Sequence, residues 1–348
     1  MAKSRKVRLL LIVIGLSLSA VSLTVLGWSY FTFLHRYQGK TVQESESSSQ
    51  ISTLVKQKDQ DFVILNLADI QICDLEDLFT KERVHKEITR LVEEVKPNLI
   101  TLTGDQTWSN ENLLSITAIL SWLEDYKIPY APIIGNHDHG NVFSSAVVGR
   151  DYLCDLYEGS AHCLFKRGPS DIGTLGNYAV NIQEGDEIIR TLYFMDLGYL
   201  NEITEGQSSW FASTADSIKE QTEAYVPGMI FTHKELPEVY QAYRHYLQGT
   251  ATAEGAVHVH YGFAGVTQTG FASLAKSKGV TDFLCGHEHG NNFTIVDEGA
   301  RYTFCLKTGE YGGFYEDETV YLNGATVIRI GESTSIEHHF VTQEEYRG

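Results

Sequence analysis

Short apolar runs rich in Val, Ile, Leu and Phe recur along the chain. They occupy residues 62–68, 99–103, 132–134, 229–232 and 283–285. Their length and composition are typical of buried strands. Residues 81–96 and 109–126, which separate the first three runs, have apolar positions at helical spacing, and Pro97 ends the first of these helices. This alternation of strand and helix predicts right-handed crossovers and a parallel sheet.

The second half of the chain has a different pattern. A strand is predicted at residues 188–195 and a helix at 236–247. Period-two segments separated by glycine then cover residues 293–296, 302–306, 325–330 and 336–341. Such segments indicate antiparallel strands. Residues 142–185 have no regular period, so we expect a long irregular excursion beside the functional site. The whole pattern predicts an α/β fold with two stacked sheets flanked by helices.

Each of the buried strands ends near residues that can bind a metal. These are Asp69, Gln71, Asp105, Asn136, His233, His287 and His289. Because ligands gather where the strands of an α/β sheet end, we expect these side chains to converge on one crevice. Carboxylate, amide and imidazole groups together suit hard or borderline divalent cations. The set is too large for one ion and suits two ions that share a carboxylate.

The most informative stretch is Gly-Asn-His-Asp at residues 135–138, directly after the apolar run 132–134. An amide, an imidazole and a carboxylate that leave a core strand together are costly to bury without partners, which favours a functional loop. An ordinary polar loop after a strand is the alternative for this tetrapeptide taken alone.

The N-terminal region predicts a membrane anchor. Residues 1–8 are basic, and residues 9–34 form an uncharged stretch of about 26 residues, whereas a bilayer requires roughly 20. The basic flank and the aromatic residues at the far end predict a single-pass helix with the rest of the chain outside the cytoplasm. A cleaved signal peptide, which would give a secreted protein, is the alternative. Residues 35–60 are polar and predict a flexible stalk before a domain at 61–345.

The net charge of −18 disfavours a nucleic acid as partner. A small phosphate ester remains compatible with this charge, because bound metal ions would attract it locally. An intracellular nucleic-acid phosphodiesterase is therefore disfavoured, by the charge and by the membrane segment alike.

The order of the motifs resembles that of the calcineurin-like metallophosphoesterases, and within them the purple-acid-phosphatase-like branch. The motifs are Asp-x-Gln at 69–71, Gly-Asp at 104–105, Gly-Asn-His-Asp at 135–138, Thr-His at 232–233 and Gly-His-Glu-His at 286–289. The resemblance extends over roughly residues 61–341. It implies a four-layer α/β/β/α sandwich of two mixed sheets. It also implies the hydrolysis of phosphate esters by a water activated by two metal ions.

The same resemblance implies a role for each site residue. Asp69, Gln71 and His289 would hold the first metal, Asn136, His233 and His287 the second, and Asp105 would bridge the two. His137 would hydrogen-bond the phosphate and help the leaving group, with Asp138 orienting its ring. The ions would be divalent Mn, Zn, Fe or Mg.

Two positions depart from common patterns of the family. Gln71 stands where many members have His, and its amide oxygen is a weaker and harder donor than imidazole. Trp108 stands where purple acid phosphatases place a tyrosine ligand, and an indole cannot ligate a metal. We therefore predict a membrane-anchored, extracytoplasmic phosphoesterase whose first metal site is weakened. The alternative is a metal-binding scaffold without catalytic activity.

Overall fold

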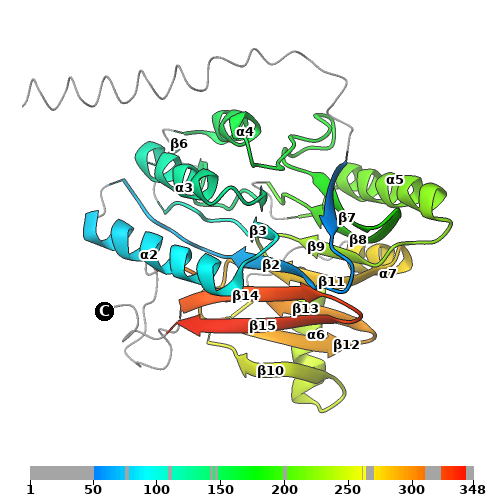
Figure 1. Ribbon diagram of the computed structural model, residues 1–348. Helices are drawn as coiled ribbons and strands as arrows, with labels where there is room; N and C mark the ends of the chain where they lie inside the picture. Colours follow the sequence, from blue (N-terminus) through cyan, green and yellow to red (C-terminus); the bar gives the residue numbers. More distant parts are fainter. Residues whose placement is uncertain are drawn as a thin grey trace, which may run out of the picture. The chain divides into compact units, whose positions relative to one another are not determined.

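The computed structural model contains two mixed β-sheets with helices packed on each (Figure 1). It describes residues 51–74, 78–108, 112–141, 144–145, 148–198, 202–260, 262–263, 270–309 and 323–341. The expected α/β class with two mixed sheets is confirmed. The expected membrane helix at residues 9–34 lies outside the described residues, and none of the helices within them has the length and apolarity required to cross a bilayer.

The smaller sheet has five strands in the order β15-β14-β2-β3-β4. Their bounds are β2 (Phe62–Leu67), β3 (Leu99–Leu102), β4 (Tyr130–Pro132), β14 (Asn323–Ile330) and β15 (Thr334–Val341). β2, β3 and β4 are parallel, as predicted, and are connected through helices α2 (Leu78–Val95) and α3 (Leu113–Tyr126). The antiparallel pair β14 and β15 joins this sheet beside β2. Buried apolar side chains fill β2 and β3, and this explains why both are continuous hydrophobic runs.

The larger sheet has eight strands in the order β1-β7-β8-β9-β11-β13-β12-β10. Their bounds are β1 (Ser52–Lys56), β7 (Tyr178–Glu184), β8 (Glu187–Phe194), β9 (Gly228–Phe231), β10 (Thr252–His258), β11 (Val280–Cys285), β12 (Asn292–Asp297) and β13 (Ala300–Phe304). β8, β9, β11 and β13 run parallel to one another. Helices α5 (Glu205–Thr222), α6 (Pro237–Leu247) and α7 (Phe271–Ser277) pack against this sheet.

Two expectations from the sequence are corrected. Residues 52–56, which the sequence placed in the stalk, form β1 and pair with β7 at the edge of the larger sheet. Residues 142–185 are not wholly irregular, because they contain helix α4 (Arg150–Gly159), strand β7 and the second strand of the short hairpin formed by β5 (Gly140–Asn141) and β6 (Ser144–Ser145). Strand β1 was missed because it is short and its partner β7 is distant in sequence.

Parallel strands in both sheets determine the location of the candidate site. The segments after β2, β3 and β4 contain the first three motifs, and the segments after β9 and β11 contain the last two. Backbone hydrogen bonds continue beyond the strand ends, from Asp69 N to Gly104 O at 3.2 Å and from Gly286 N to His233 O at 2.9 Å. The motifs from each sheet are therefore held in fixed register with one another.

Candidate metal centre

Several predicted ligands lie on strained backbone. Asp69, Gln71, Asp105 and His287 have positive φ angles of 52°, 51°, 53° and 76°. This region costs a non-glycine residue on the order of 1–3 kcal/mol, and such strain clusters at active sites and ligand clamps. Its recurrence at four residues after three strands, β2, β3 and β11, is difficult to explain by packing and indicates a shared site.

Two glycines allow the strand ends to approach each other. A Cβ atom at Gly104, whose φ is +93°, would lie 2.4 Å from His233 Nδ1. A Cβ atom at Gly135 would lie 2.1 Å from the backbone nitrogen of Asp105 and 2.2 Å from its Oδ1. These distances are too short for any side chain, so glycine is required for the site to close around Asp105 and His233.

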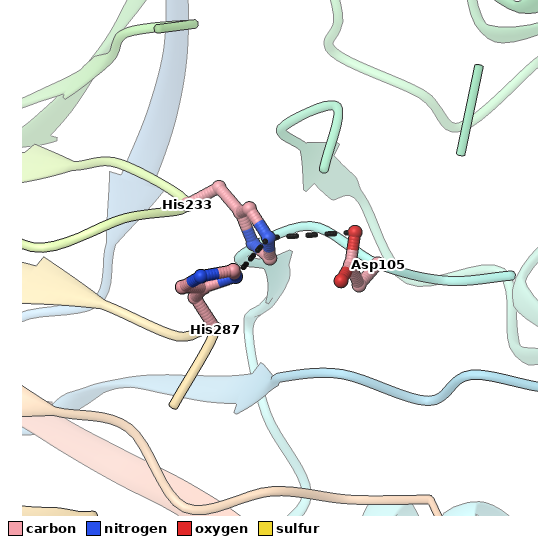
Figure 2. A group of neighbouring side chains, drawn as sticks. All are labelled: Asp105, His233 and His287. Carbon is pink, nitrogen blue, oxygen red and sulfur yellow. Dashed lines mark hydrogen bonds and ion pairs between the residues drawn. The ribbon is translucent and has the colours of Figure 1, made fainter. Parts of the chain in front are cut away.

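Three of the predicted ligands converge on one atom of a fourth, Nε2 of the buried His233. It lies 3.0 Å from Asn136 Oδ1, 3.2 Å from His287 Nδ1 and 3.4 Å from Asp105 Oδ1. Figure 2 shows His233 between His287 and Asp105, and the ligand atoms of these three residues lie within 4.8 Å of one another. A single proton on Nε2 cannot serve all three of these neighbours, whereas a divalent cation can be ligated by the whole group. The set therefore fits a metal ion.

The protonation of His233 supports this assignment. Its Nδ1 lies 2.8 Å from the carbonyl oxygen of Thr103. A carbonyl only accepts hydrogen bonds, so Nδ1 donates and Nε2 is left to face the other ligands. Burial lowers the pKa of His233, but the adjacent carboxylate of Asp105 more than compensates and raises it to about 9. A proton thus occupies the position that a cation would take, and metal binding would displace it.

The carboxylate of Asp105 lies between the two predicted metal sites. Its Oδ1 accepts a hydrogen bond from the backbone nitrogen of His137 at 2.8 Å, and its Oδ2 accepts one from Gln71 Nε2 at 3.2 Å. Burial raises the pKa of Asp105, but the positive charge of His233 and the hydrogen bonds from His233 and from the backbone of His137 outweigh it and hold the pKa well below the usual range. Asp105 is therefore an anion. Its Oδ1 faces the backbone of His137 and its Oδ2 faces Gln71, so the two oxygens point in different directions, as a bridging ligand requires.

Asp69 and His289, expected at the first metal, lie next to each other. Asp69 Oδ1 is 3.5 Å from His289 Nε2, beyond the usual length of a hydrogen bond. Asp69 Oδ2 accepts a hydrogen bond from the backbone nitrogen of His287 at 3.0 Å, whereas its buried Oδ1 makes no hydrogen bond to the described residues. Burial raises the pKa of Asp69, but its interaction with His289 gives a net lowering. Asp69 Oδ1 is thus a candidate ligand atom.

Gln71 is oriented differently from what a ligand requires. Its amide nitrogen donates to Asp105 Oδ2, and its amide oxygen lies 3.5 Å from the side-chain nitrogen of Lys307. The structure therefore brings Gln71 to the site but directs its oxygen away from Asp105. Lys307 was not among the residues predicted from the sequence. The sequence nevertheless contained an indication that Lys307 lies at the site, because this residue follows the apolar strand β13 just as the predicted ligands follow their strands.

His137 has the partial exposure that contact with a substrate requires. Its side chain is 35% exposed, and its Nε2 lies 3.9 Å from Asp105 Oδ2. The indole of Trp108 packs against its ring with a centroid distance of 4.2 Å. Burial is the main cause that lowers the pKa of His137, so the neutral imidazole is favoured. Trp108 therefore does not supply a metal ligand at the position where a tyrosine could, and its ring instead holds His137 in place.

Asp138 is buried and accepts hydrogen bonds at both of its carboxylate oxygens. Its Oδ1 accepts hydrogen bonds from the backbone nitrogen and the hydroxyl of Thr107 at 2.8 and 3.2 Å, and its Oδ2 accepts one from Gly135 N at 2.8 Å. The ring of His137 is not among its hydrogen-bond partners in the described residues. Burial, together with the charge of Asp105, raises the pKa of Asp138 to about 7. Asp138 therefore closes the turn at 135–138 through its hydrogen bonds.

The fold and this site define a class of protein. A family model described as calcineurin-like phosphoesterase matches residues 62–291. The chain belongs to the calcineurin-like phosphoesterase family, and the resemblance expected from its motifs is confirmed. Members of this family use divalent metal ions, in agreement with the ligand cluster around His233.

Individual relatives are purple-acid-phosphatase-like. The chain is 25% identical over 271 residues to probable inactive purple acid phosphatase 29 of Arabidopsis thaliana, covering 67% of this chain and 68% of the relative. It is 24% identical over 251 residues to probable inactive purple acid phosphatase 28 of the same plant, covering 65% and 60% respectively. The chain thus spans only about two thirds of the lengths of these relatives.

Solved structures with a similar arrangement include two phosphatases. A dimetal phosphatase from Danio rerio matches with a TM-score of 0.49 and 12% identity, over 80% of this chain and 96% of that chain. Purple acid phosphatase PPD1 of yellow lupin matches with a TM-score of 0.45 and 11% identity, over 77% and 49%.

The close approach at Gly135 gives a first prediction. In Gly135→Ala the new methyl group would overlap Asp105, and we expect metal affinity to fall by at least roughly tenfold, the scale seen when groups beside metal ligands are displaced. Mn²⁺ titration of the purified chain measures this change. Gly149→Ala is the control, because a Cβ atom there meets nothing within 4 Å. Unchanged affinity in Gly135→Ala would show that this turn does not shape the site.

Proposed function

We propose that the chain is a metal-dependent hydrolase of small phosphate esters. The observation that supports this most directly is the convergence of Asn136, His287 and Asp105 on His233 Nε2, next to a partly exposed His137. Membership of the calcineurin-like phosphoesterase family supports the reaction class. The acidic charge of the chain favours a small ester over a nucleic acid as substrate.

Asp105, Asn136, His233 and His287 would hold one divalent ion. Asp69 and His289 would contribute to the first site, together with the shared Asp105. Bound divalent ions at such a site supply positive charge for the phosphate oxygens and a nucleophile derived from water. Thr103 keeps the ring of His233 in the required orientation through its carbonyl oxygen.

His137 would act on the substrate without binding metal. Its backbone nitrogen is fixed by Asp105 and its ring by Trp108, so its imidazole has a defined position beside the cluster. One ring nitrogen of the neutral imidazole can donate a hydrogen bond to a phosphate oxygen. A protonated ring can transfer its proton to the oxygen of the departing alcohol. The closed turn held by Asp138 preserves this geometry.

Two variants test these roles. We expect His137→Ala to lower turnover by roughly 10²–10⁴-fold, the range for acid–base assistance, while metal content stays near that of the wild type. We expect Asp105→Ala to lose metal, because its carboxylate is the anion shared by the site. Hydrolysis of a panel of phosphate monoesters and diesters, together with metal analysis of the same samples, measures both effects.

The same measurements also distinguish a hydrolase from a metal-binding scaffold without catalytic activity. Equal metal loss in the two variants would mean that His137 is a ligand. A wild-type chain that binds Mn²⁺ or Zn²⁺ but hydrolyses no ester in the panel would contradict the proposed activity and favour the non-catalytic scaffold. The names of the two Arabidopsis relatives describe those proteins as probably inactive, which makes this comparison informative.

We further propose that the chain is anchored in a cell membrane by residues 9–34, with the domain outside the cytoplasm. The basic residues at 1–8 and the uncharged stretch that follows support this topology. Because β1 belongs to the domain, the proposed stalk is confined to residues 35–50. A secreted form after signal cleavage is the alternative.

Protease treatment of intact cells tests the topology. We expect added protease to release the folded domain by cutting near residues 45–49, because this Ser- and Glu-rich stretch precedes the first strand. Immunoblotting of the medium detects the fragment, and lysed cells provide the control. Protection of the domain until the cells are lysed would contradict the orientation, and release without protease would favour secretion.

A further inference from the structure

Lys234 directly follows the predicted ligand His233, in the segment that connects β9 to α6. The backbone of this segment is held by hydrogen bonds on both sides. Gly286 N donates to His233 O at 2.9 Å, and the hydroxyl of Thr232 donates to Lys234 O at 2.7 Å. Helix α6 begins three residues further on, at Pro237. The position of the lysine relative to the metal centre is therefore determined by the fold.

The side chain of Lys234 is partly buried, and its ammonium group lies close to the metal centre. Burial lowers the pKa of Lys234, and the opposing charge with the largest effect is that of Asp105. Burial, followed by the positive charges of His233 and Lys234, lowers the pKa of His287 to about 3. The ammonium group thus lies within electrostatic reach of two predicted ligands, one from each sheet.

The ammonium group of Lys234 forms no hydrogen bond or ion pair with the residues that the structure describes. Two further carboxylates, Glu235 and Glu288, act on it only at longer range. Glu235 is fully buried, and Glu288 lies with its Oε1 3.8 Å from His287 Nε2. A partly buried cation without a direct partner is costly, and an anion bound beside it would offset this cost. Lys234 is therefore available for an anionic ligand.

Charge determines which phosphate ester suits this arrangement. Near neutral pH a phosphate monoester carries close to two negative charges and has three terminal oxygens, whereas a diester carries one negative charge and has two such oxygens. A fixed ammonium group beside the site adds an attraction that increases with the charge of the ligand, and partial burial weakens its screening by solvent. It also donates charge-assisted hydrogen bonds, which the additional terminal oxygen of a monoester can accept.

We propose that Lys234 binds a terminal oxygen of the phosphate group and makes the chain selective for phosphate monoesters over diesters. This inference rests on the proposed function and deepens it, because it names the class of ester. Lys234 acts as a binding residue: its ammonium group donates a hydrogen bond to the phosphate and transfers no proton. The roles of the metal ligands and of His137 are unchanged.

The test is the binding of two non-hydrolysable ligands to the full-length, Mn²⁺-loaded chain, measured by calorimetry at mildly alkaline pH. Phenylphosphonate is a dianion with three terminal oxygens, and its monomethyl ester is a monoanion with two. We expect the wild-type chain to bind phenylphosphonate more tightly. We expect Lys234→Met to lose roughly 10–100-fold of this affinity, the scale for a hydrogen bond to a charged group, and to lose less for the methyl ester.

Matched variants control for unrelated effects. Lys234→Arg keeps the positive charge and should retain most of the preference for phenylphosphonate. Lys56→Met removes another largely buried lysine, which pairs with Glu184 at 3.0 Å away from the motifs, and should bind both ligands like the wild type. Metal analysis should find the same Mn²⁺ content in Lys234→Met as in the wild type, because an ammonium group does not ligate a metal. Circular dichroism melting verifies that each variant is folded.

Equal affinity for phenylphosphonate in the wild type and in folded Lys234→Met would overturn the proposal. A lower melting temperature together with unchanged ligand affinity would mean that Lys234 only offsets the charges of Glu235 and Glu288. Loss of Mn²⁺ in Lys234→Met would also contradict it, because the lysine would then act on the metal centre and not on the phosphate.

These readings are independent of turnover. A chain that hydrolyses no ester but loses phenylphosphonate affinity in Lys234→Met would refute the proposed function and leave the role of Lys234 intact. A chain that hydrolyses monoesters and diesters with the same relative kcat/KM in the wild type and in Lys234→Met would do the reverse.

Discussion

The buried anion of Asp105 is the feature on which the rest of the site depends. An isolated carboxylate in the protein interior is very costly, so its charge must be balanced by nearby cations and donors. The structure supplies the imidazole of His233, the backbone nitrogen of His137 and the amide of Gln71. The strained turns and the two close glycines are arranged so that these groups can reach it. The contacts of the site thus offset the free-energy cost of burying this carboxylate.

Both sheets contribute residues to the site around Asp105. The smaller sheet provides the anions, Asp69 and Asp105, and the turn that bears Asn136 and His137. The larger sheet provides the cationic or neutral groups, His233 and His287 from the ends of β9 and β11 and Lys307 from the end of β13. Because Asp105 comes from the smaller sheet and His233 from the larger one, their interaction also connects the two sheets. The proposed function and the packing of the two sheets therefore both depend on the contact between Asp105 and His233.

The sequence predicted this centre because its elements are local. An apolar strand followed by a ligand is visible within ten residues, as at Asp69, Asp105 and His233, and the order of such motifs indicated the family. The orientation of Gln71 could not be predicted, because its neighbours Asp105 and Lys307 are 34 and 236 positions away. The hydrogen bonds of Asp138 could not be predicted either, because its partner Thr107 follows a different motif, 31 positions away. Strand β1 was missed because it is short and its partner β7 lies 128 positions further along the chain.

The claim that one cation is held beside Asp105 is tested most directly by X-ray diffraction from crystals grown with Mn²⁺, with data collected to maximise the anomalous signal of manganese. We expect one strong anomalous peak within about 2.0–2.3 Å of ligand atoms from Asp105, Asn136, His233 and His287. A map without a peak at this position, in crystals that contain manganese elsewhere in the molecule, would contradict the account.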